Sequence, residues 1–390
     1  MPRQIRPRMI QLEVSSHCQL RCPACPTTLG TIHPAVGSGF LQPDDFARLL
    51  DANPAIRLVE LSNNGEIFLN PRLLEVLRIA SARGVAVQAM NGANLNSVRD
   101  EVLEGVVKYG LTTITCSIDG ASQETYQRYR VRGNFERVMN NVRRLNHWKR
   151  HYGSDRPLLR WQFVVFGHNE HELDTARRMA EELGMAFVPK LSWDEELSPP
   201  RDPAKVREAT GGHASRREFR AETGSDYMGG ICHQLWDSPQ INWDGRVLGC
   251  CRNTWAEFGG NAFRDGLTAS INGETMTHAR QMLLGRAPPR DDVPCTNCEI
   301  YQGMHETGRY LKRDDAAGGQ QFTLEEALEL ATEWEASGRR DDAASVYRRI
   351  LAALPGHAEA ARRLGMLGEA VSAPVRVEMA GSGSIGGPRP

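Results

Sequence analysis

Short apolar segments alternate with amphipathic helical patterns over the first 190 residues of the chain. Helical patterns between these segments end at glycines such as Gly84, Gly110 and Gly184, the residue type that most often stops a helix. This alternation predicts an α/β fold with a parallel sheet, which right-handed crossovers can curl into an open, partial (βα)6 barrel or into a closed one. The six predicted strands cover residues 9–14, 56–61, 85–90, 112–118, 158–166 and 185–191.

The pattern changes after the predicted barrel, which we assign to residues 1–191. Residues 192–228 are charged and rich in proline, which predicts a connector with one helix. Residues 229–315 hold five of the nine cysteines and several turn signals, which is typical of a small, loop-rich α+β unit stapled by metal.

Three amphipathic helices with short turns are predicted over residues 324–370. Small, turn and aromatic residues there resemble one tetratricopeptide unit and a following helix. One such unit cannot bury both of its faces, so we expect it to pack on the preceding domain or on a partner. The positions that carry this resemblance are Ala327, Ala331, Gly338, Ala343, Tyr347, Leu351 and Pro355. Residues 371–390 are of low complexity and are predicted to be disordered.

The composition of the chain limits the cellular location and the classes of binding partner that we expect. The 390 residues carry a formal net charge of -1, which does not call for nucleic acid or a membrane surface as a partner. The start of the chain lacks an apolar signal core, and no apolar run is long enough to span a bilayer. We therefore expect a cytoplasmic protein with reduced thiols, whose nine cysteines indicate metal rather than disulfides.

Three cysteines, Cys18, Cys22 and Cys25, follow the first predicted strand with the spacing C-x3-C-x2-C. Three thiolates so close together can hold three corners of an iron–sulfur cluster and leave one iron open for chemistry. A structural zinc loop is the alternative, but zinc needs a nearby fourth ligand. His17 is the candidate for that ligand, and it directly abuts Cys18.

The three-cysteine motif in the loop after the first barrel strand resembles the radical S-adenosylmethionine (SAM) superfamily. The resemblance implies that Cys18, Cys22 and Cys25 hold a catalytic 4Fe–4S cluster whose open iron binds SAM. It departs from the family at Ala24, where an aromatic residue is frequent. Further SAM contacts that the resemblance implies are Gly65, Glu66, Asn91, Ser117 and Arg130.

Several residues near these predicted SAM contacts have other interpretations. Arg132 is a rival to Arg130, and either could instead be a solvated helix charge. Cys116 lies within a predicted strand and is interpreted as a core thiol. Asp119 and Gly120 are interpreted as a tight turn.

The second cysteine set resembles the twitch module, a shortened SPASM domain that holds one auxiliary 4Fe–4S cluster. Its implied ligands are Cys232, Cys250, Cys295 and Cys298. Cys251 is a neighbour that points to the opposite face if residues 250 and 251 lie on a strand. A four-cysteine zinc site is the alternative that spacing alone allows.

These resemblances imply a radical SAM oxidoreductase with two 4Fe–4S clusters and SAM. The expected substrate is small and polar, similar to a sugar or an aminocyclitol, and the auxiliary cluster would accept an electron in a dehydrogenation or support an epimerisation. Flavodoxin or ferredoxin is the expected reductant. A peptide-modifying maturase that binds protein through its C-terminal helices and a non-catalytic, zinc-stapled binding protein are the alternatives. Candidates for the proton acceptor are Arg160, Gln162 and Lys190.

Overall fold

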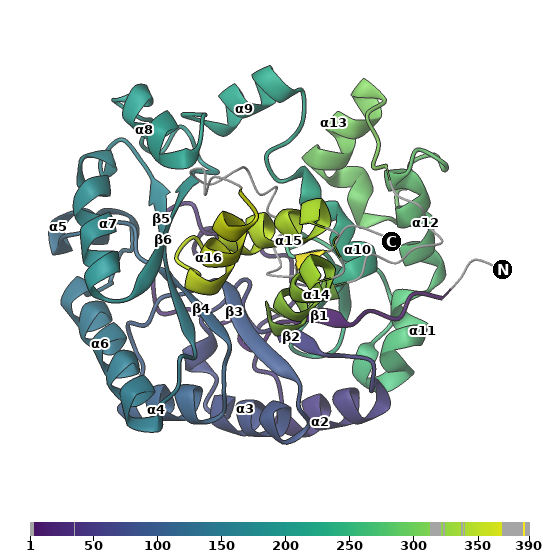
Figure 1. Ribbon diagram of the computed structural model, residues 1–390. Coiled ribbons are helices and arrows are strands. Elements are labelled where there is room, and N and C mark those ends of the chain that lie inside the picture. The colour runs from purple at the N-terminus through teal and green to yellow at the C-terminus, as the bar shows by residue number, and fades with distance from the viewer. Residues whose placement is uncertain are drawn as a thin grey trace.

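The architecture is that of a computed structural model, which describes residues 4–34, 36–312, 321–322, 324–336, 338, 340–368 and 385–386. Six strands form a parallel sheet in chain order, and two short strands extend it beyond the first strand (Figure 1). The strands are β1 (Met9–Leu12), β2 (Leu58–Glu60), β3 (Ala86–Ala93), β4 (Thr113–Ser117), β5 (Leu158–Val165), β6 (Met185–Leu191), β7 (Gln240–Ile241) and β8 (Val247–Gly249). All six predicted barrel strands are therefore present, and the prediction of a partial barrel is confirmed.

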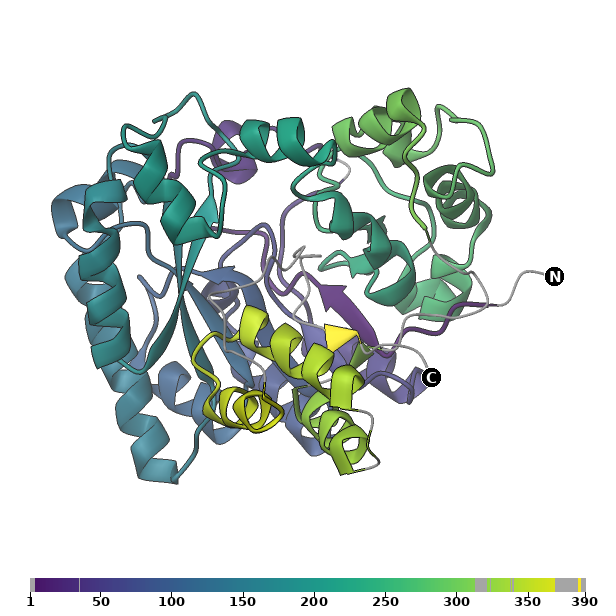
Figure 2. The same cartoon turned by 45° about the horizontal axis from the view of Figure 1, so that its top comes forward.

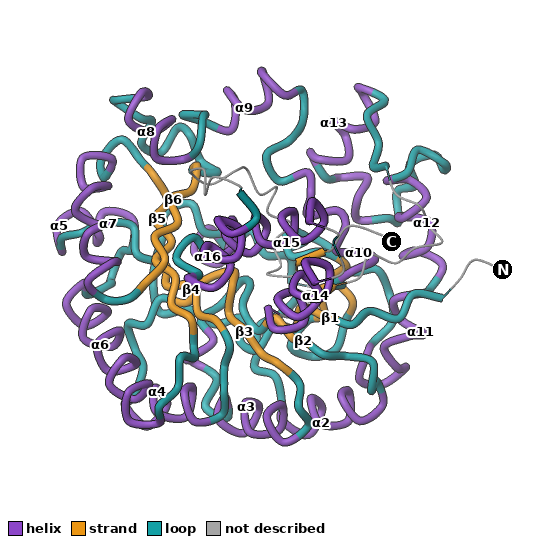
Figure 3. Tube along the Cα trace, viewed as in Figure 1, coloured by secondary structure: helices purple, strands orange, loops and turns teal. Residues whose placement is uncertain are grey.

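Helices cover the outer face of this sheet, as the tube in Figure 3 shows. In chain order they are α2 (Pro43–Ala52), α3 (Leu73–Ala82), α4 (Asp100–Lys108), α5 (Gln123–Tyr129), α6 (Phe135–Tyr152) and α7 (Leu173–Glu182). The single turn α1 (Pro26–Leu29) belongs instead to the loop after β1. The predicted helix ends are confirmed, because Gly84, Gly110 and Gly184 follow α3, α4 and α7 and have positive φ angles.

Alternation along the strands separates an apolar face from a polar one. On β5, Trp161 and Phe163 are fully buried in the core beneath the helices. Arg160 and Gln162 belong to the other, inner face, and both are almost completely buried. Adjacent strands pair in register, which places Thr115 of β4 beside Arg160 on this face.

The connector contains two helices, where the sequence predicted one. Asp202 caps α8 (Pro203–Thr210) by accepting from the N–H of Lys205, and Ser215 caps α9 (Arg216–Thr223) in the same way. Each helix ends at a left-handed glycine. The prediction was wrong because these capping signals lie in a strongly charged segment with few apolar positions to mark a helix face.

The cysteine-rich region adds a hairpin and four helices to the edge of the sheet. Strand β7 pairs in parallel with β1 and antiparallel with β8, which attaches this region directly to the barrel. Its helices are α10 (Gln234–Asp237), α11 (Leu267–Ile271), α12 (Glu274–Leu283) and α13 (Glu299–Thr307).

The C-terminal helices form a unit with its own core, which includes Tyr347 and Ile350. They are α14 (Leu324–Ala336), α15 (Arg340–Ala353) and α16 (Ala358–Met366), as predicted. The tetratricopeptide resemblance of this unit stays a prediction. The predicted disorder of residues 371–390 lies outside the described residues, apart from β10 (Ile385–Gly386), which pairs with β9 (Gln321–Phe322).

This helical unit lies against the N-terminal ends of the barrel strands (Figure 2). Leu324 and Leu354 line a cavity there together with Leu58 and Thr113 of the barrel. Arg156, which precedes β5, forms an ion pair with Glu325 of α14. The unit thus buries one face on the preceding domain, which is one of the two arrangements expected for it. Within the part of the chain that the structure describes, no helix has the length and apolar character needed to cross a membrane.

Candidate metal centres

The loop after β1 gathers the first three cysteines. Cys18, Cys22 and Cys25 belong to one small apolar cluster with Tyr129 and Phe166. Hydrogen bonds within the loop fix its turn, since the N–H of Cys25 donates to the carbonyl of Cys22 over 3.1 Å. The same loop then continues into α1, whose N-cap is Cys25. The chain therefore presents three thiols from a single short, ordered turn.

Two hydrogen-bond donors reach the sulfurs of this loop. Nη1 of Arg130 lies 3.6 Å from Sγ of Cys22, and Nδ2 of Asn94 lies 3.7 Å from Sγ of Cys18. Burial raises the pKa of Cys18 to about 11 and also raises that of Cys22. The free thiols of Cys18 and Cys22 are therefore protonated at neutral pH, and a bound metal would have to displace their protons. Donors directed at sulfur suit thiolates, so this environment fits a cluster.

Arg130 is held in place by a buried carboxylate. Its Nε donates to Oδ2 of Asp119 over 2.5 Å, and its guanidinium lies 5.3 Å from the ring centre of Tyr129. Asp119 is fully buried and also accepts from the N–H of Val164. Arg132, by contrast, is exposed and has a left-handed backbone with φ of 70°. Of the two rival arginines, Arg130 is therefore the one that faces the cysteine loop.

The loop after β2 is clamped onto the cysteine loop. The N–H of Glu66 donates to the carbonyl of His17 over 2.7 Å. A Cβ on Gly65 would lie 1.9 Å from the carbonyl oxygen of Ser15, so only glycine fits there. The carboxylate of Glu66 accepts from the N–H of Asn94 over 2.6 Å, and burial raises its pKa to about 7. Gly65 and Glu66 thus lie against Ser15 and His17, directly before Cys18, and their role as SAM contacts stays a prediction.

The remaining predicted contacts lie on the inner face of the barrel. Ser117 ends β4, and its Oγ lies 2.5 Å from where a Cβ on Gly92 would be. The side chain of Asn91 donates to the carbonyl of Ser62 over 2.7 Å and to Oε1 of Gln11 over 3.2 Å. Asn91 therefore ties β1, β2 and β3 together.

The interpretation of Cys116 as a core thiol is confirmed. The residue is fully buried in the apolar core beneath the helices. Strand β4 alternates, so this thiol faces away from the side that carries Thr115 and Ser117.

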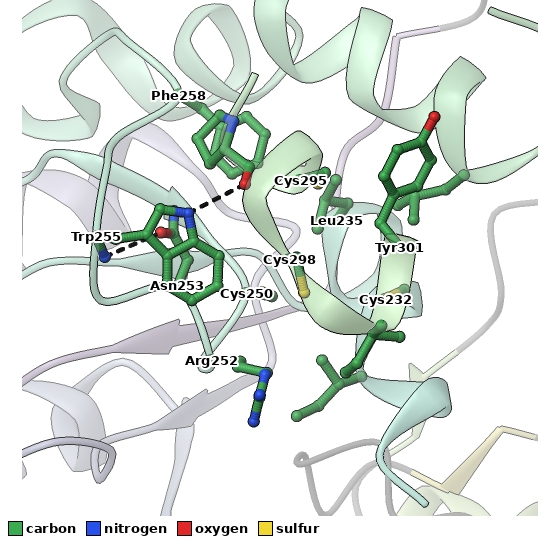
Figure 4. A pocket seen from close by; sticks show the side chains of 14 residues that line it. Cys232, Leu235, Cys250, Arg252, Asn253, Trp255, Phe258, Cys295, Cys298 and Tyr301 are labelled. Carbon is green, nitrogen blue, oxygen red and sulfur yellow. Dashed lines mark hydrogen bonds between the residues drawn. The ribbon is translucent and has the colours of Figure 1, made fainter. Parts of the chain in front are cut away.

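The second cysteine set lines one cavity in the cysteine-rich region (Figure 4). Cys232 lies on a 3₁₀ helix (Gly229–His233), and Cys250 directly follows β8. Cys295 lies on a second 3₁₀ helix (Pro294–Asn297), and Cys298 caps α13. Apart from these cysteines the lining is largely apolar, and Trp255 closes one side by donating from Nε1 to the carbonyl of Pro294. Four separate elements thus bring four thiols to one enclosed site.

Burial dominates the chemistry of these thiols. It raises the pKa of Cys250 to about 12 and holds those of Cys232 and Cys295 well above their ordinary value, with the neighbouring thiols as the next cause. As neutral thiols these side chains suit the apolar lining, and a bound cation or cluster would have to displace their protons to use them as thiolate ligands.

Cys251 does not line the cavity of the other four cysteines. Its Sγ accepts from Nε2 of Gln234 over 3.5 Å, and its N–H donates to Oε1 of the same residue over 2.8 Å. Cys250 and Cys251 thus face different surroundings, and the geometry supports Cys250 as the ligand.

Two residues near the first site were missed by sequence reasoning. Asp119 was interpreted as part of a tight turn, but it is the buried ion-pair partner of Arg130. Asn94, which approaches Cys18, was not singled out. Both follow or end a barrel strand, and a polar residue at that position was the one available signal.

The geometry agrees with the comparison with known protein families. Residues 12–179 match the radical SAM superfamily, and residues 232–299 match SPASM, an iron–sulfur cluster-binding domain. The chain therefore contains a radical SAM domain and a SPASM domain. The first domain implies a 4Fe–4S cluster and SAM, and the second implies auxiliary iron–sulfur binding.

Two curated proteins match in sequence. The AdoMet-dependent heme synthase of Methanosarcina barkeri is 28% identical over 204 residues, which is 50% of this chain and 55% of the relative. The cofactor-modifying protein for tungsten-containing aldehyde ferredoxin oxidoreductase of Pyrococcus furiosus is 24% identical over 183 residues, which is 46% and 49%. The chain thus spans about half the length of the curated relatives it matches.

Solved structures show the same fold. Streptococcus suis SuiB bound to S-adenosylmethionine superposes with a TM-score of 0.54 at 13% identity, covering 76% of this chain and 71% of SuiB. Native anSMEcpe with bound AdoMet superposes with a TM-score of 0.50 at 11% identity, covering 75% of this chain and 87% of anSMEcpe. At these identities the likeness extends to the fold alone.

Replacing Gly65 with alanine should loosen the clamp between the two loops. We expect Gly65→Ala to lower the free energy of unfolding by about 1–3 kcal/mol, because the new Cβ overlaps a carbonyl oxygen. Chemical denaturation and iron content measure this. Gly356→Ala is the control, since a Cβ there meets nothing within 4 Å. Unchanged stability and iron loading in Gly65→Ala would contradict the clamp.

The two adjacent cysteines give a second test. Cys250→Ala should lose about four irons per chain, since it removes a proposed ligand of one four-iron cluster. Cys251→Ala should keep its iron, because this thiol lies outside the cavity. Anaerobic iron and sulfide analysis of both variants decides the matter, and loss of iron from Cys251→Ala alone would reverse the assignment.

Proposed function

We propose that this chain, with its radical SAM and SPASM domains, is a radical SAM oxidoreductase that abstracts a hydrogen atom from a small polar substrate. The observation that carries the proposal is the pairing of two cysteine sets with a polar inner barrel face. The first set follows β1, and Cys250 of the second set follows β8, which the sheet joins to β1 through β7.

The proposed cofactors supply the chemistry. When bound, the cluster held by Cys18, Cys22 and Cys25 would supply one electron for the reductive cleavage of SAM and so for hydrogen abstraction from the substrate. The cluster held by the second cysteine set would provide an acceptor for the electron that the substrate releases together with a proton. A dehydrogenation balances in this way. An epimerisation would instead return a hydrogen atom to the substrate radical from a donor.

The residues of this chain would position SAM. We assign Cys18, Cys22 and Cys25 to the first cluster and Glu66 to the ammonium of SAM, because a buried carboxylate is suited to accept from it. Assigning Arg130 to the carboxylate of SAM requires that it share its donors with Asp119. Nη1 already points at Cys22, and Nε is occupied by Asp119.

The second cysteine set would hold the auxiliary cluster. We assign Cys232, Cys250, Cys295 and Cys298 to one auxiliary cluster, because all four line one cavity.

The C-terminal helices cover the N-terminal ends of the strands and would keep water from the reacting centre on that side.

The packing of the C-terminal helical unit on the barrel favours a substrate that is not a peptide. The faces of α14 and α15 that line the cavity against the barrel are engaged with it, which leaves less of the unit for capturing a peptide. The names of the two curated relatives refer to a heme and to a cofactor. A sugar-like, aminocyclitol-like or cofactor-like substrate is therefore favoured, and a peptide-modifying maturase is the second candidate. SuiB, of similar fold, has been solved with a precursor peptide.

The proposed cleavage requires one electron from outside the chain. We expect a flavodoxin or a ferredoxin to supply it, and we place the protein in the cytoplasm, where thiols stay reduced for cluster assembly.

The central variant is Cys18→Ala/Cys22→Ala/Cys25→Ala. Wild type should hold about eight irons per chain and form 5′-deoxyadenosine from SAM under dithionite, and the variant should hold about four irons and form none. Anaerobic iron analysis and chromatography of the nucleoside measure both quantities. Zinc in place of iron in wild type, with no cleavage, would instead support the zinc-stapled binding protein.

A further inference from the structure

The inner barrel face carries a group of cations beyond the SAM contacts. Arg160 of β5 is fully buried, and Lys190 near the end of β6 is partly buried. The strand register places Lys190 beside Val164, which lies on the same face of β5 as Arg160. Arg216, at the start of α9, donates from Nη2 to the carbonyl of Leu191 over 3.3 Å. This donation brings the guanidinium next to the end of β6.

Much of the hydrogen-bonding capacity of these cations is unused. Nε and Nη2 of Arg160 and Nε of Arg216 are buried without a hydrogen-bond partner in the described chain. Nη1 of Arg160 contacts only Oγ1 of Thr115 and Sδ of Met90, neither of which is charged. Buried donors without acceptors are costly, so they mark a place where an acceptor is missing.

The carboxylates nearest to these cations are engaged elsewhere. Asp119 forms the ion pair with Arg130. Glu60 accepts from the backbone and hydroxyl of Ser62 and from the N–H of Met90, and burial raises its pKa to about 7. Neither forms an ion pair with Lys190 or Arg160 among the ion pairs of the described residues.

Two further carboxylates lie beside Arg216. Glu195 forms its ion pair with Arg217, and Asp226 accepts from the N–H of Met228. The guanidinium of Arg216 instead lies 4.8 Å from the ring centre of Tyr227, a weaker partner than a carboxylate. The group of cations therefore has more positive charge than its surroundings neutralise.

We propose that Lys190 and Arg216 bind an anionic group of the substrate, a carboxylate or a phosphate, with Arg160 deeper on the same barrel face. The identity of this group as part of the substrate rests on the proposed function, whereas anion binding at this place does not. An anion would supply the missing acceptor, and an arginine fork beside a lysine is suited to carboxylate and phosphate oxygens.

The protonation of Lys190 agrees with this arrangement. Burial, followed by repulsion from Arg160 and Arg216, lowers its pKa to about 7, and Cys251 and Asp119 oppose this shift. A bound anion would restore the charge of the ammonium. Affinity should therefore be higher below about pH 7 and fall as the pH rises above it, because the free lysine then loses its proton.

Calorimetry can test the site without knowing the substrate. We would titrate citrate and inorganic phosphate, with glycerol as the neutral comparison, into the anaerobic, cluster-loaded protein. At least one of the two anions should bind saturably. Lys190→Gln and Arg216→Gln should each weaken that binding by about tenfold, the effect of one lost charge-assisted hydrogen bond. Glycerol should not bind.

Matched variants separate this site from general surface charge. Lys108→Gln on α4 and Arg143→Gln on α6 remove exposed cations away from this site and should leave anion binding unchanged. Equal binding in all four variants, or no saturable binding of either anion in wild type up to tens of millimolar, would overturn the proposal.

Saturating SAM distinguishes the two sources of an anionic group. If binding persists with SAM present, the site belongs to another molecule, as proposed. If SAM abolishes it, the site holds the carboxylate of SAM and the inference is wrong. Failure of SAM cleavage with intact anion binding would instead refute the proposed function and leave the anion site standing.

Discussion

The contact between the loops after β1 and β2 is the constraint on which the first site depends. Gly65 packs against the carbonyl oxygen of Ser15, and Glu66 donates its N–H to the carbonyl of His17. The carboxylate of Glu66 then fixes the N–H of Asn94, whose side chain approaches Cys18. The loops that follow three barrel strands thus converge on a single cysteine turn, and most of these contacts involve a backbone group, which fixes geometry more firmly than exposed side chains do.

The outer face of the sheet stabilises the fold, and the inner face carries the polar groups of the candidate site. Trp161 and Phe163 bury the outer face beneath helices, and this apolar burial stabilises the barrel. The inner face carries polar groups such as Arg160 and Gln162, some of whose donors and acceptors are left unsatisfied. Unsatisfied buried groups reduce stability, and functional sites are where such a cost is most often found. The helical unit at the N-terminal ends of the strands covers this face on one side.

The strands and the first cysteine set could be predicted because their signals are local. Apolar runs mark the six strands, and the spacing of Cys18, Cys22 and Cys25 is contained in one loop. The ion pair between Arg130 and Asp119 could not be predicted, because it joins residues on both sides of a helix and depends on burial. The packing of the C-terminal helices on the barrel could not be predicted either. Amphipathic periodicity shows that a helix has an apolar face, but not whether the preceding domain or a partner covers it.

Electron paramagnetic resonance of the dithionite-reduced protein, with and without SAM, tests most directly whether two clusters occupy two chemically distinct sites. The account predicts two reduced-cluster signals, of which SAM changes only one, because one cluster has an open iron and the other has four cysteine ligands. A single signal, or two signals that SAM leaves unchanged, would contradict it.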